Sequence, residues 1–331
     1  MGAVKKADLK RYIVKRILFF TITLYIIITI NFLLPRLMPG NPVDYFLKDP
    51  SITPEERMRL IKQFGLDKDI FTQYILYIRN LFTGNLGISF RYYPKPVIEV
   101  ILSRLPWTIY LLGISYPLST LIGIIIGAYA AWRKDSKLDL ITIGMAFVTR
   151  SMPIFWLGML ILYVFSATLG WFPLSGAVTP GTSYSSFFDF ALDVLKHSIL
   201  PILTITIFLL GPPALIARGL ILDLLTEPFI STAKAKGLPP RIILFRHALR
   251  PVSLPLSSYT AILLGYMVGG AVFTETVFSW PGVGRLIYEA IMRRDYPLIQ
   301  GAFFIISVSV LVANLIVDVL YAYLDPRVRL Q

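Results

Sequence analysis

The sequence predicts an all-α integral membrane protein with six transmembrane helices. Of the 331 residues, 56% are hydrophobic and only 15% are charged, and the mean hydropathy is +0.69. An ordinary soluble domain is roughly one-quarter charged. The apolar residues are also gathered into six long windows that are almost free of charge. Such a chain belongs in a lipid bilayer, and we expect it in the cytoplasmic (inner) membrane.

Each window is long enough to cross the membrane as a helix. A spanning helix needs about 20 apolar residues to cross a hydrocarbon core of about 30 Å. The backbone must satisfy its own hydrogen bonds there, which favours a helix. The six predicted spans are residues 17–35, 105–132, 140–168, 197–217, 251–274 and 296–324.

Basic residues predict the orientation, because Lys and Arg in short segments stay on the cytoplasmic side. Residues 1–16 hold six cations, and the first span lacks the cleavage site of a signal peptide. Basic residues also fill the loop after the second span and the loop after the fourth, which hold Arg133, Lys134, Lys137, Lys234, Lys236, Arg241, Arg246 and Arg250. We therefore expect the cytoplasmic segments to be 1–16, 218–250 and the tail 325–331, and the external ones to include 36–104 and 275–295.

The external segment 36–104 is predicted to form a small helical cap. Thr53, Pro54 and Glu56 make a good helix start, with a hydroxyl N-cap, a proline in the first turn and an acid facing the positive helix end. Gly65 is placed to end that helix. A second helix is expected over residues 70–81, ended by Gly84. The cap is either purely structural or a docking surface for an external partner, and both readings stay open.

Several function classes lack the residues that they need. The chain has no cysteine and only two histidines, so thiolate chemistry is excluded and no metal site is expected. It has neither an H-E-x-x-H motif nor paired aspartates in facing spans, so no catalytic residue is predicted. The net charge of +13 is assigned to cytoplasmic loops, and we expect no nucleic-acid partner. An ion-coupled secondary transporter remains an alternative of another class, as does a channel or scaffold without energy coupling.

The cytoplasmic loop 218–250 is predicted to contain a short helix with a sharply defined C-terminal end. Pro228 fits the first turn, Gly237 can close the helix with a positive φ, and the prolines that follow Leu238 forbid its continuation. Small residues at 233, 235 and 237 would let this helix lie close in a groove of another protein, while Lys234 and Lys236 add steering charge. The pattern indicates a segment that couples this chain to another protein.

This loop resembles that of permease subunits of ATP-binding-cassette importers, in the dipeptide, oligopeptide and nickel branch. The family motif is Glu-Ala-Ala, three residues and Gly, followed later by Leu-Pro. The chain has Ser231-Thr232-Ala233, Gly237 and Leu254-Pro255, and its run from Thr232 to Gly237 resembles the Thr-Ala-Arg-Ala-Lys-Gly of this branch. The resemblance assigns ATPase coupling to Ser231, Thr232, Ala233, Lys234, Ala235, Lys236, Gly237 and Leu238.

Other matches to the same family run along the whole chain. They are Met38-Pro39-Gly40-Asn41-Pro42, Gly84-Asn85-Leu86-Gly87-Ile88-Ser89, Arg104-Leu105-Pro106-Trp107-Thr108, Pro153-Ile154-Phe155-Trp156-Leu157-Gly158, Glu275-Thr276-Val277-Phe278-Ser279-Trp280-Pro281-Gly282, Arg294-Asp295-Tyr296-Pro297 and Leu324-Asp325-Pro326-Arg327.

The resemblance implies a type I importer permease that forms half of a translocation pathway. Its partners would be a second homologous permease in a heterodimer, two cytoplasmic ATPase subunits and an external solute-binding protein. ATP and Mg²⁺ would bind to the ATPases, and this chain would bind no cofactor. It contains no G-x-x-x-x-G-K-[ST] phosphate loop of its own. Peptides are the expected cargo, with oligosaccharides or nickel as alternatives.

Polar residues inside the spans are candidate functional groups, because an ionisable side chain is costly in lipid. Arg150 lies in the third span just before Pro153, where a kink is expected. Together with Phe155 and Trp156 it is a candidate for the substrate path. The alternative is that Arg150 reaches the interface, or pairs with an acid of a neighbouring subunit.

Two further groups are assigned from their places in the sequence. Asn314 and Asp318 share a face of the last span, nearer its cytoplasmic end, and we interpret them as structural polar residues. Asp318 is expected to pair with a cation near the interface, and proton coupling is the alternative role. The external end of the fifth span is expected to shape the external gate, with Glu275, Trp280, Pro281 and Gly282.

Overall fold

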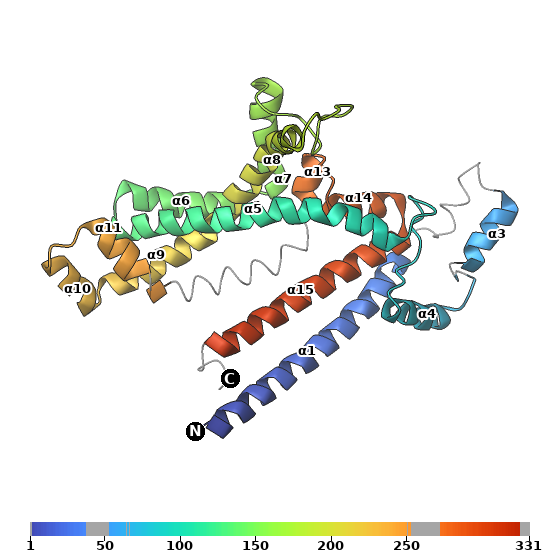
Figure 1. Ribbon diagram of the computed structural model, residues 1–331, viewed down its shortest axis with the longest axis horizontal. Coiled ribbons are helices and arrows are strands. Elements are labelled where there is room, and N and C mark those ends of the chain that lie inside the picture. Colours follow the sequence, from blue (N-terminus) through green and yellow to red (C-terminus); the bar gives the residue numbers. More distant parts are fainter. Residues whose placement is uncertain are drawn as a thin grey trace. The chain divides into compact units, whose positions relative to one another are not determined.

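The computed structural model describes residues 2–37, 53–63, 65, 67–249, 251–252 and 272–324, and all elements of this part are helices (Figure 1). The all-α prediction is confirmed. The helices are α1 (Gly2–Leu37), α3 (Pro54–Gln63), α4 (Ile70–Phe82), α5 (Val97–Trp132), α6 (Lys137–Ser151), α7 (Ile154–Leu162), η1 (Tyr163–Thr168), α8 (Phe187–Leu209), α9 (Gly211–Leu225), α10 (Pro228–Ala235), α11 (Pro240–Ile242), η2 (Ile243–Ala248), α13 (Val272–Val277), α14 (Val283–Arg293) and α15 (Tyr296–Leu324).

The chain forms two compact units. The first unit comprises Met1–Thr108, Val268–Val272 and Pro281–Gln331, and the second comprises Ile109–Met267 and Phe273–Trp280. Helix α5 contributes its first part to one unit and the rest to the other.

Several described helices meet the length and composition of a membrane span. Val14–Leu37 in α1, all of α5 and all of α8 qualify as single helices. The pair Lys137–Ser151 and Ile154–Thr168 qualifies together but is bent by 101°. Helix α15 coincides with the predicted sixth span, whereas most of the predicted fifth span, 251–274, lies outside the described residues. The count of six spans remains a prediction.

The expected kink in the third span is a complete break. Met152 has the extended backbone angles φ −80° and ψ 134°, and Pro153 then serves as the N-cap of α7. Proline disfavours the helical conformation of the residue before it, which explains the position of the break. The predicted fourth span is likewise two helices, α8 and α9, which meet at Leu210 and Gly211.

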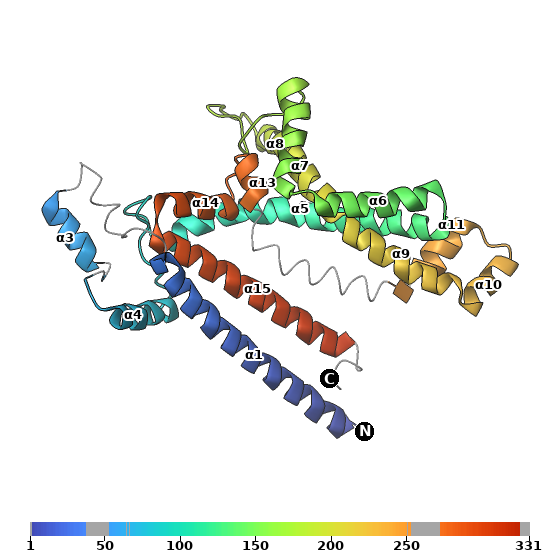
Figure 2. The ribbon, with the colours of Figure 1, turned by 180° about the vertical axis from the view of Figure 1, so that it is seen from behind.

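In the first unit, α1 and α15 lie side by side and antiparallel (Figures 1 and 2). The amide of Asn31 donates to the backbone carbonyl of Gln300 at 2.7 Å, which ties the end of α1 to the start of α15. It also donates to the hydroxyl of Tyr77 on α4 at 3.0 Å. The buried ring of Phe32 packs against Tyr74 and Tyr77, with ring centroids 5.0 and 5.5 Å apart.

The two cap helices form where the sequence predicts them, as α3 and α4. Asp69 caps α4 by accepting the hydroxyl of Thr72 at 2.6 Å and the backbone N–H of Thr72 at 2.9 Å, and these hydrogen bonds lower the pKa of the Asp69 carboxyl. Gly65 and Gly84 have φ of +63° and +73°, conformations that few residues other than glycine adopt.

In the second unit, α9 packs closely against α5 and α6. A Cβ atom on Gly127 would lie 2.1 Å from the carbonyl oxygen of Ala214, so α5 and α9 touch through their backbones. On the other side, a Cβ on Gly211 would lie 3.0 Å from the Cα of Ala146 in α6. Small residues allow such approaches, which drive helix association in lipid. Gly127 therefore serves the packing of α5 on α9.

We expect Gly127→Ala to destabilise the second unit, because its new methyl group must displace the backbone of α9. The loss of unfolding free energy should be about 1–3 kcal/mol, the usual cost of overpacking. Gly113→Ala in the same helix is the matched control, since a Cβ there meets nothing within 4 Å. Melting of both variants in detergent gives the comparison. Equal melting temperatures would show that α5 and α9 do not pack in this way.

Candidate functional site

The predicted coupling helix exists as α10 and rests on a buried apolar base. Ile230 is fully buried and Ala233 is 5% exposed. These two side chains pack into a cluster that draws residues from the ends of α5 and α9 and from η2. The other buried members of the cluster are Ala128, Ala131, Ala217, Ile221, Ile243, Leu244, Ala248 and Val252.

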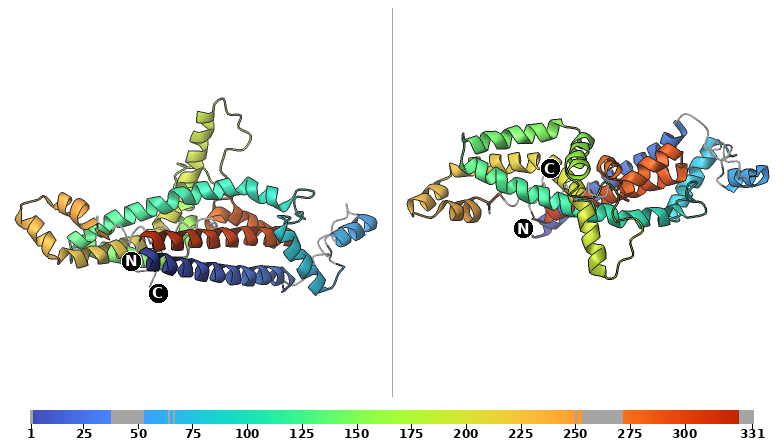
Figure 3. Two further views of the ribbon diagram at one scale, coloured as in Figure 1. Left: turned by 60° about the horizontal axis from the view of Figure 1, so that its bottom comes forward. Right: turned by 90° about the horizontal axis from the view of Figure 1, so that it is seen from above.

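The opposite side of α10 is exposed, polar and made of small or basic residues. Ser231, Thr232, Lys234, Ala235 and Lys236 are all exposed there. The ammonium of Lys234 lies 5.4 Å from the centroid of the Trp132 ring, at the end of α5. In the views of Figures 1 and 3, α10 lies beyond the ends of α5 and α9.

The position of Ala233 differs from the expectation. Its small side chain was predicted to fill a groove of another protein, but it faces the chain's own core beside Ile230. Helical periodicity explains the difference, because residues three apart share a face. The exposed small residue is Ala235 instead.

The end of α10 is fixed by a glycine in the left-handed region. Gly237 has φ +70°, and its N–H donates to the carbonyl of Lys234 at 2.9 Å. The N–H of Leu238 donates to the carbonyl of Ala233 at 3.4 Å. These two bonds form a Schellman motif, which needs a residue with positive φ at this position. Gly237 remains exposed, so the helix end is both sharply defined and accessible.

The candidate substrate-path residues gather around the break between α6 and α7. Arg150 lies in the last turn of α6 and is exposed, and Pro153 at the break is exposed too. Phe155 and Trp156, in the first turn of α7, are 41% and 42% exposed. The Phe155 ring lies 6.0 Å from that of Phe273 in α13.

The candidate gate residues lie in two different places. Glu275 and Trp280 are both fully buried, in the second unit. The Trp280 ring stacks on Tyr110 with centroids 6.0 Å apart, and the backbone N–H of Trp280 donates to the carbonyl of Glu275 at 2.8 Å. Pro281 and Gly282 belong to the first unit, where Gly282 is the N-cap of α14.

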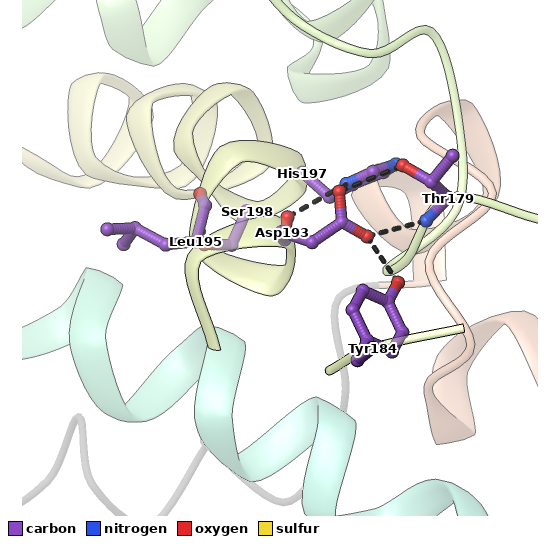
Figure 4. A network of polar contacts seen from close by, with 6 residues as sticks. All are labelled: Thr179, Tyr184, Asp193, Leu195, His197 and Ser198. Carbon is purple, nitrogen blue, oxygen red and sulfur yellow. Dashed lines mark hydrogen bonds and ion pairs between the residues drawn. The ribbon is translucent and has the colours of Figure 1, made fainter. Parts of the chain in front are cut away.

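A polar network that sequence reasoning missed holds the loop before α8 (Figure 4). The Asp193 carboxylate accepts the N–H of Thr179 at 2.7 Å, its hydroxyl at 2.8 Å and the hydroxyl of Tyr184 at 2.6 Å. The hydrogen bond to Asp193 raises the pKa of the Tyr184 hydroxyl. Nδ1 of His197 lies 2.9 Å from the Asp193 carbonyl oxygen. The spacing of Asp193 and His197, four residues apart, is the sequence signal that indicates a shared helix face.

A buried acid, Asp295, fixes the start of α15. Asp295 is fully buried and accepts the hydroxyl of Ser89, the N–H of Arg91 at 2.9 Å and the N–H of Leu298 at 3.2 Å. Burial raises the pKa of the Asp295 carboxyl. The carboxyl thereby joins the segment before α5 to the loop between α14 and α15.

Asn314 is half-buried in α15, while the side chain of Asp318 lies outside the described residues, so the structural role of both stays a prediction. Among the described residues, no group of three or more His, Cys, Asp or Glu side chains could hold a metal ion.

Family comparison decides the class of this protein. Residues 123–330 match the model of the binding-protein-dependent transport system inner membrane component, and residues 9–112 match the N-terminal model of the same membrane component. The chain belongs to this family. The type I permease fold inferred from the resemblance is confirmed, and so is the assignment to the membrane component of a transporter.

Characterised relatives match over almost the whole chain. A dipeptide transport system permease protein of Alkalihalophilus pseudofirmus is 34% identical over 331 residues, covering 96% of this chain and 99% of the relative. An oligopeptide transport system permease protein of Bacillus subtilis is 34% identical over 318 residues, with the same coverage. A dipeptide transport system permease protein of Escherichia coli is 33% identical over 336 residues, covering 96% and 98%.

We expect Ile230→Ala to loosen α10 from its base, because the truncation leaves a cavity in the buried cluster. Such truncations cost about 2–5 kcal/mol. Phe229→Ala is the matched control, since Phe229 is 43% exposed. Limited trypsin digestion measures the effect as faster cleavage after Lys234 and Lys236. Equal cleavage rates in the two variants would contradict the packing of α10.

Proposed function

We propose that this family member is the permease subunit of an ATP-driven importer of peptides and forms half of the translocation pathway. The names of its relatives support peptides as cargo, since they are dipeptide and oligopeptide permeases. No relative named here favours oligosaccharides, nickel or ion-coupled transport. The partners are a second homologous permease, two cytoplasmic ATPase subunits and an external solute-binding protein.

The observation that carries this proposal is the two-sided α10. One side is fixed in the buried cluster through Ile230, and the other presents a small and basic surface that ends sharply at Gly237. The chain has no phosphate loop, so ATP and Mg²⁺ bind to the partner ATPases and this subunit is non-catalytic.

In the proposed mechanism, nucleotide binding at the ATPases changes the relative populations of the inward-open and outward-open conformations of the permease pair. Closure of the ATPase dimer moves α10, and the attached α5 and α9 move with it. The permease pair then changes from an inward to an outward opening. Ser231, Thr232, Lys234, Ala235, Lys236 and Gly237 form the contact surface, while Ala233 and Leu238 hold it from beneath.

The proposed orientation places α10 and both termini in the cytoplasm. Lys234 lies over Trp132 at the end of α5, directly before the basic loop Arg133, Lys134 and Lys137. Two basic segments therefore gather at one end of the second unit, as the positive-inside rule requires. In the first unit α1 and α15 are antiparallel, so the start of α1 and the end of α15 lie on the same side. We assign Glu275, Trp280, Pro281 and Gly282 to the external gate region.

We expect Ala235→Arg to block docking of the ATPase, because the position is exposed, helical and free of backbone strain. Loss of an interface anchor costs about 2 kcal/mol or more, which corresponds to roughly a thirtyfold loss of affinity. Thr226→Arg, also exposed but preceding α10, is the control. Copurification of the ATPase subunits with the permease measures the effect. If Ala235→Arg retained both ATPase subunits and uptake, α10 would not be the coupling element.

We expect Arg150→Gln to weaken uptake of acidic peptides, because a cation at the α6–α7 break attracts substrate carboxylates. The half-saturation concentration should rise by roughly tenfold, the value of a charge-assisted hydrogen bond. Uptake of a neutral peptide, measured in the same vesicles, is the control. An unchanged half-saturation concentration for the acidic peptide would remove Arg150 from the path.

A further inference from the structure

An ion pair joins α6 to α9 in the second unit, with a buried Asp139 and an Arg218 side chain that is 20% exposed. Asp139, in the first turn of α6, is 1% exposed. The guanidinium of Arg218 on α9 donates to both of its carboxylate oxygens, from Nε to Oδ1 and from Nη2 to Oδ2 at 2.8 Å. The backbone N–H of Asp135 donates to Oδ2 at 3.0 Å. The ion pair is thus bidentate, and the Asp139 carboxylate accepts a third hydrogen bond from the backbone.

Stability alone does not explain an ion pair at this position. Burying two charges costs several kcal/mol of desolvation for each ion, and apolar residues of equal volume often stabilise a protein as well or better. A bidentate pair does, however, fix the relative orientation of the two groups. Close contact through Gly211 and Ala146 sets the distance between α9 and α6, and the bidentate pair of Arg218 and Asp139 adds a fixed orientation to that contact. The ion pair therefore determines the register of α6 on α9.

Both helices lead to functional segments. Helix α9 carries Ile221, which packs in the same cluster as Ile230 of α10. Helix α6 ends at the break before Pro153, where Arg150 lies, and α7 follows. The pair thus lies between the coupling helix and the candidate substrate path.

We propose that the Asp139–Arg218 ion pair is the joint that transmits movement of α10 and α9 to α6 and the substrate path. Asp139 and Arg218 are positioning residues that touch neither ATPase nor cargo. This inference rests on the proposed function and adds to it the route by which ATP-driven movement reaches the membrane. Without the joint, α10 and α9 would still respond to ATP, but α6 would no longer follow.

The chain contains no cysteine, so this subunit can be labelled at a single site before it is assembled with its partners. A fluorophore on Glu227→Cys reports on the N-terminal end of α10, and one on Ser151→Cys reports on the last residue of α6. Both positions are exposed. The full importer, with its ATPase and binding-protein partners, is reconstituted in lipid vesicles. ATP hydrolysis and uptake of tritiated dialanine are measured in the same preparation.

The test variant is Asp139→Asn with Arg218→Gln, which removes both charges and leaves no unpaired ion. We expect its ATP-induced signal at residue 227 to persist and the signal at residue 151 to vanish. Uptake per ATP hydrolysed should fall by roughly tenfold or more, the effect of losing about 1.4 kcal/mol of coupling. The control is Glu289→Gln, which breaks the partly exposed ion pair with Arg285 in α14 and should leave the ratio unchanged.

Two further results separate the alternatives. Arg218→Lys keeps the charge but loses the bidentate geometry, so it tests the joint if the neutral variant does not assemble, and it too should lower uptake per ATP. If folded complexes of either variant kept the wild-type uptake per ATP hydrolysed and the wild-type signal at residue 151, the inference would be overturned. The ion pair would then have only a structural role. If the wild-type signal at residue 227 did not respond to ATP, the proposed function itself would fail.

Discussion

The second unit depends on the close approach of α9 to its two neighbours. Lipid provides no hydrophobic drive for helix association, because its chains are as apolar as the side chains. Backbone contact at Gly127 and Gly211 replaces that drive, since it lets long stretches of helix meet at van der Waals distance. A residue with a Cβ at either position would separate the helices. The apolar cluster beneath α10 is built on the ends of α5 and α9, so it depends on the same contacts.

The close packing explains how one short helix can be anchored and available at once. Eight residues offer little surface, and an isolated helix of this length would not be stable in water. Burial of Ile230 and the turn at Gly237 supply what the helix lacks by itself. The remaining side chains are then free to be small or basic, which suits a contact surface that engages a partner.

The sequence predicts elements with local signals well and long-range pairings poorly. Gly237 and Gly84 end helices through their own backbone conformation, and α15 follows one long and mostly apolar window, so all three could be predicted directly. Asp139 and Arg218 lie 79 residues apart, and no local rule pairs them. The inward direction of Ala233 depends on which face of α10 finds the end of α9. Tertiary packing decides that choice.

The breaks inside the predicted third and fourth spans illustrate the same limit and support our proposal for the position of the substrate path. Proline at 153 predicted a kink, but only the structure gives the full bend of 101°. A helix that stops within a bilayer leaves carbonyl and N–H groups without partners, which is tolerated only where protein or a water-filled cavity meets them. Arg150 needs water or an anion for the same reason. Backbone groups without helical partners and an ionisable side chain are thus expected together at the break between α6 and α7. Both need a polar surrounding, and this is the physical argument for proposing that the substrate path passes the break.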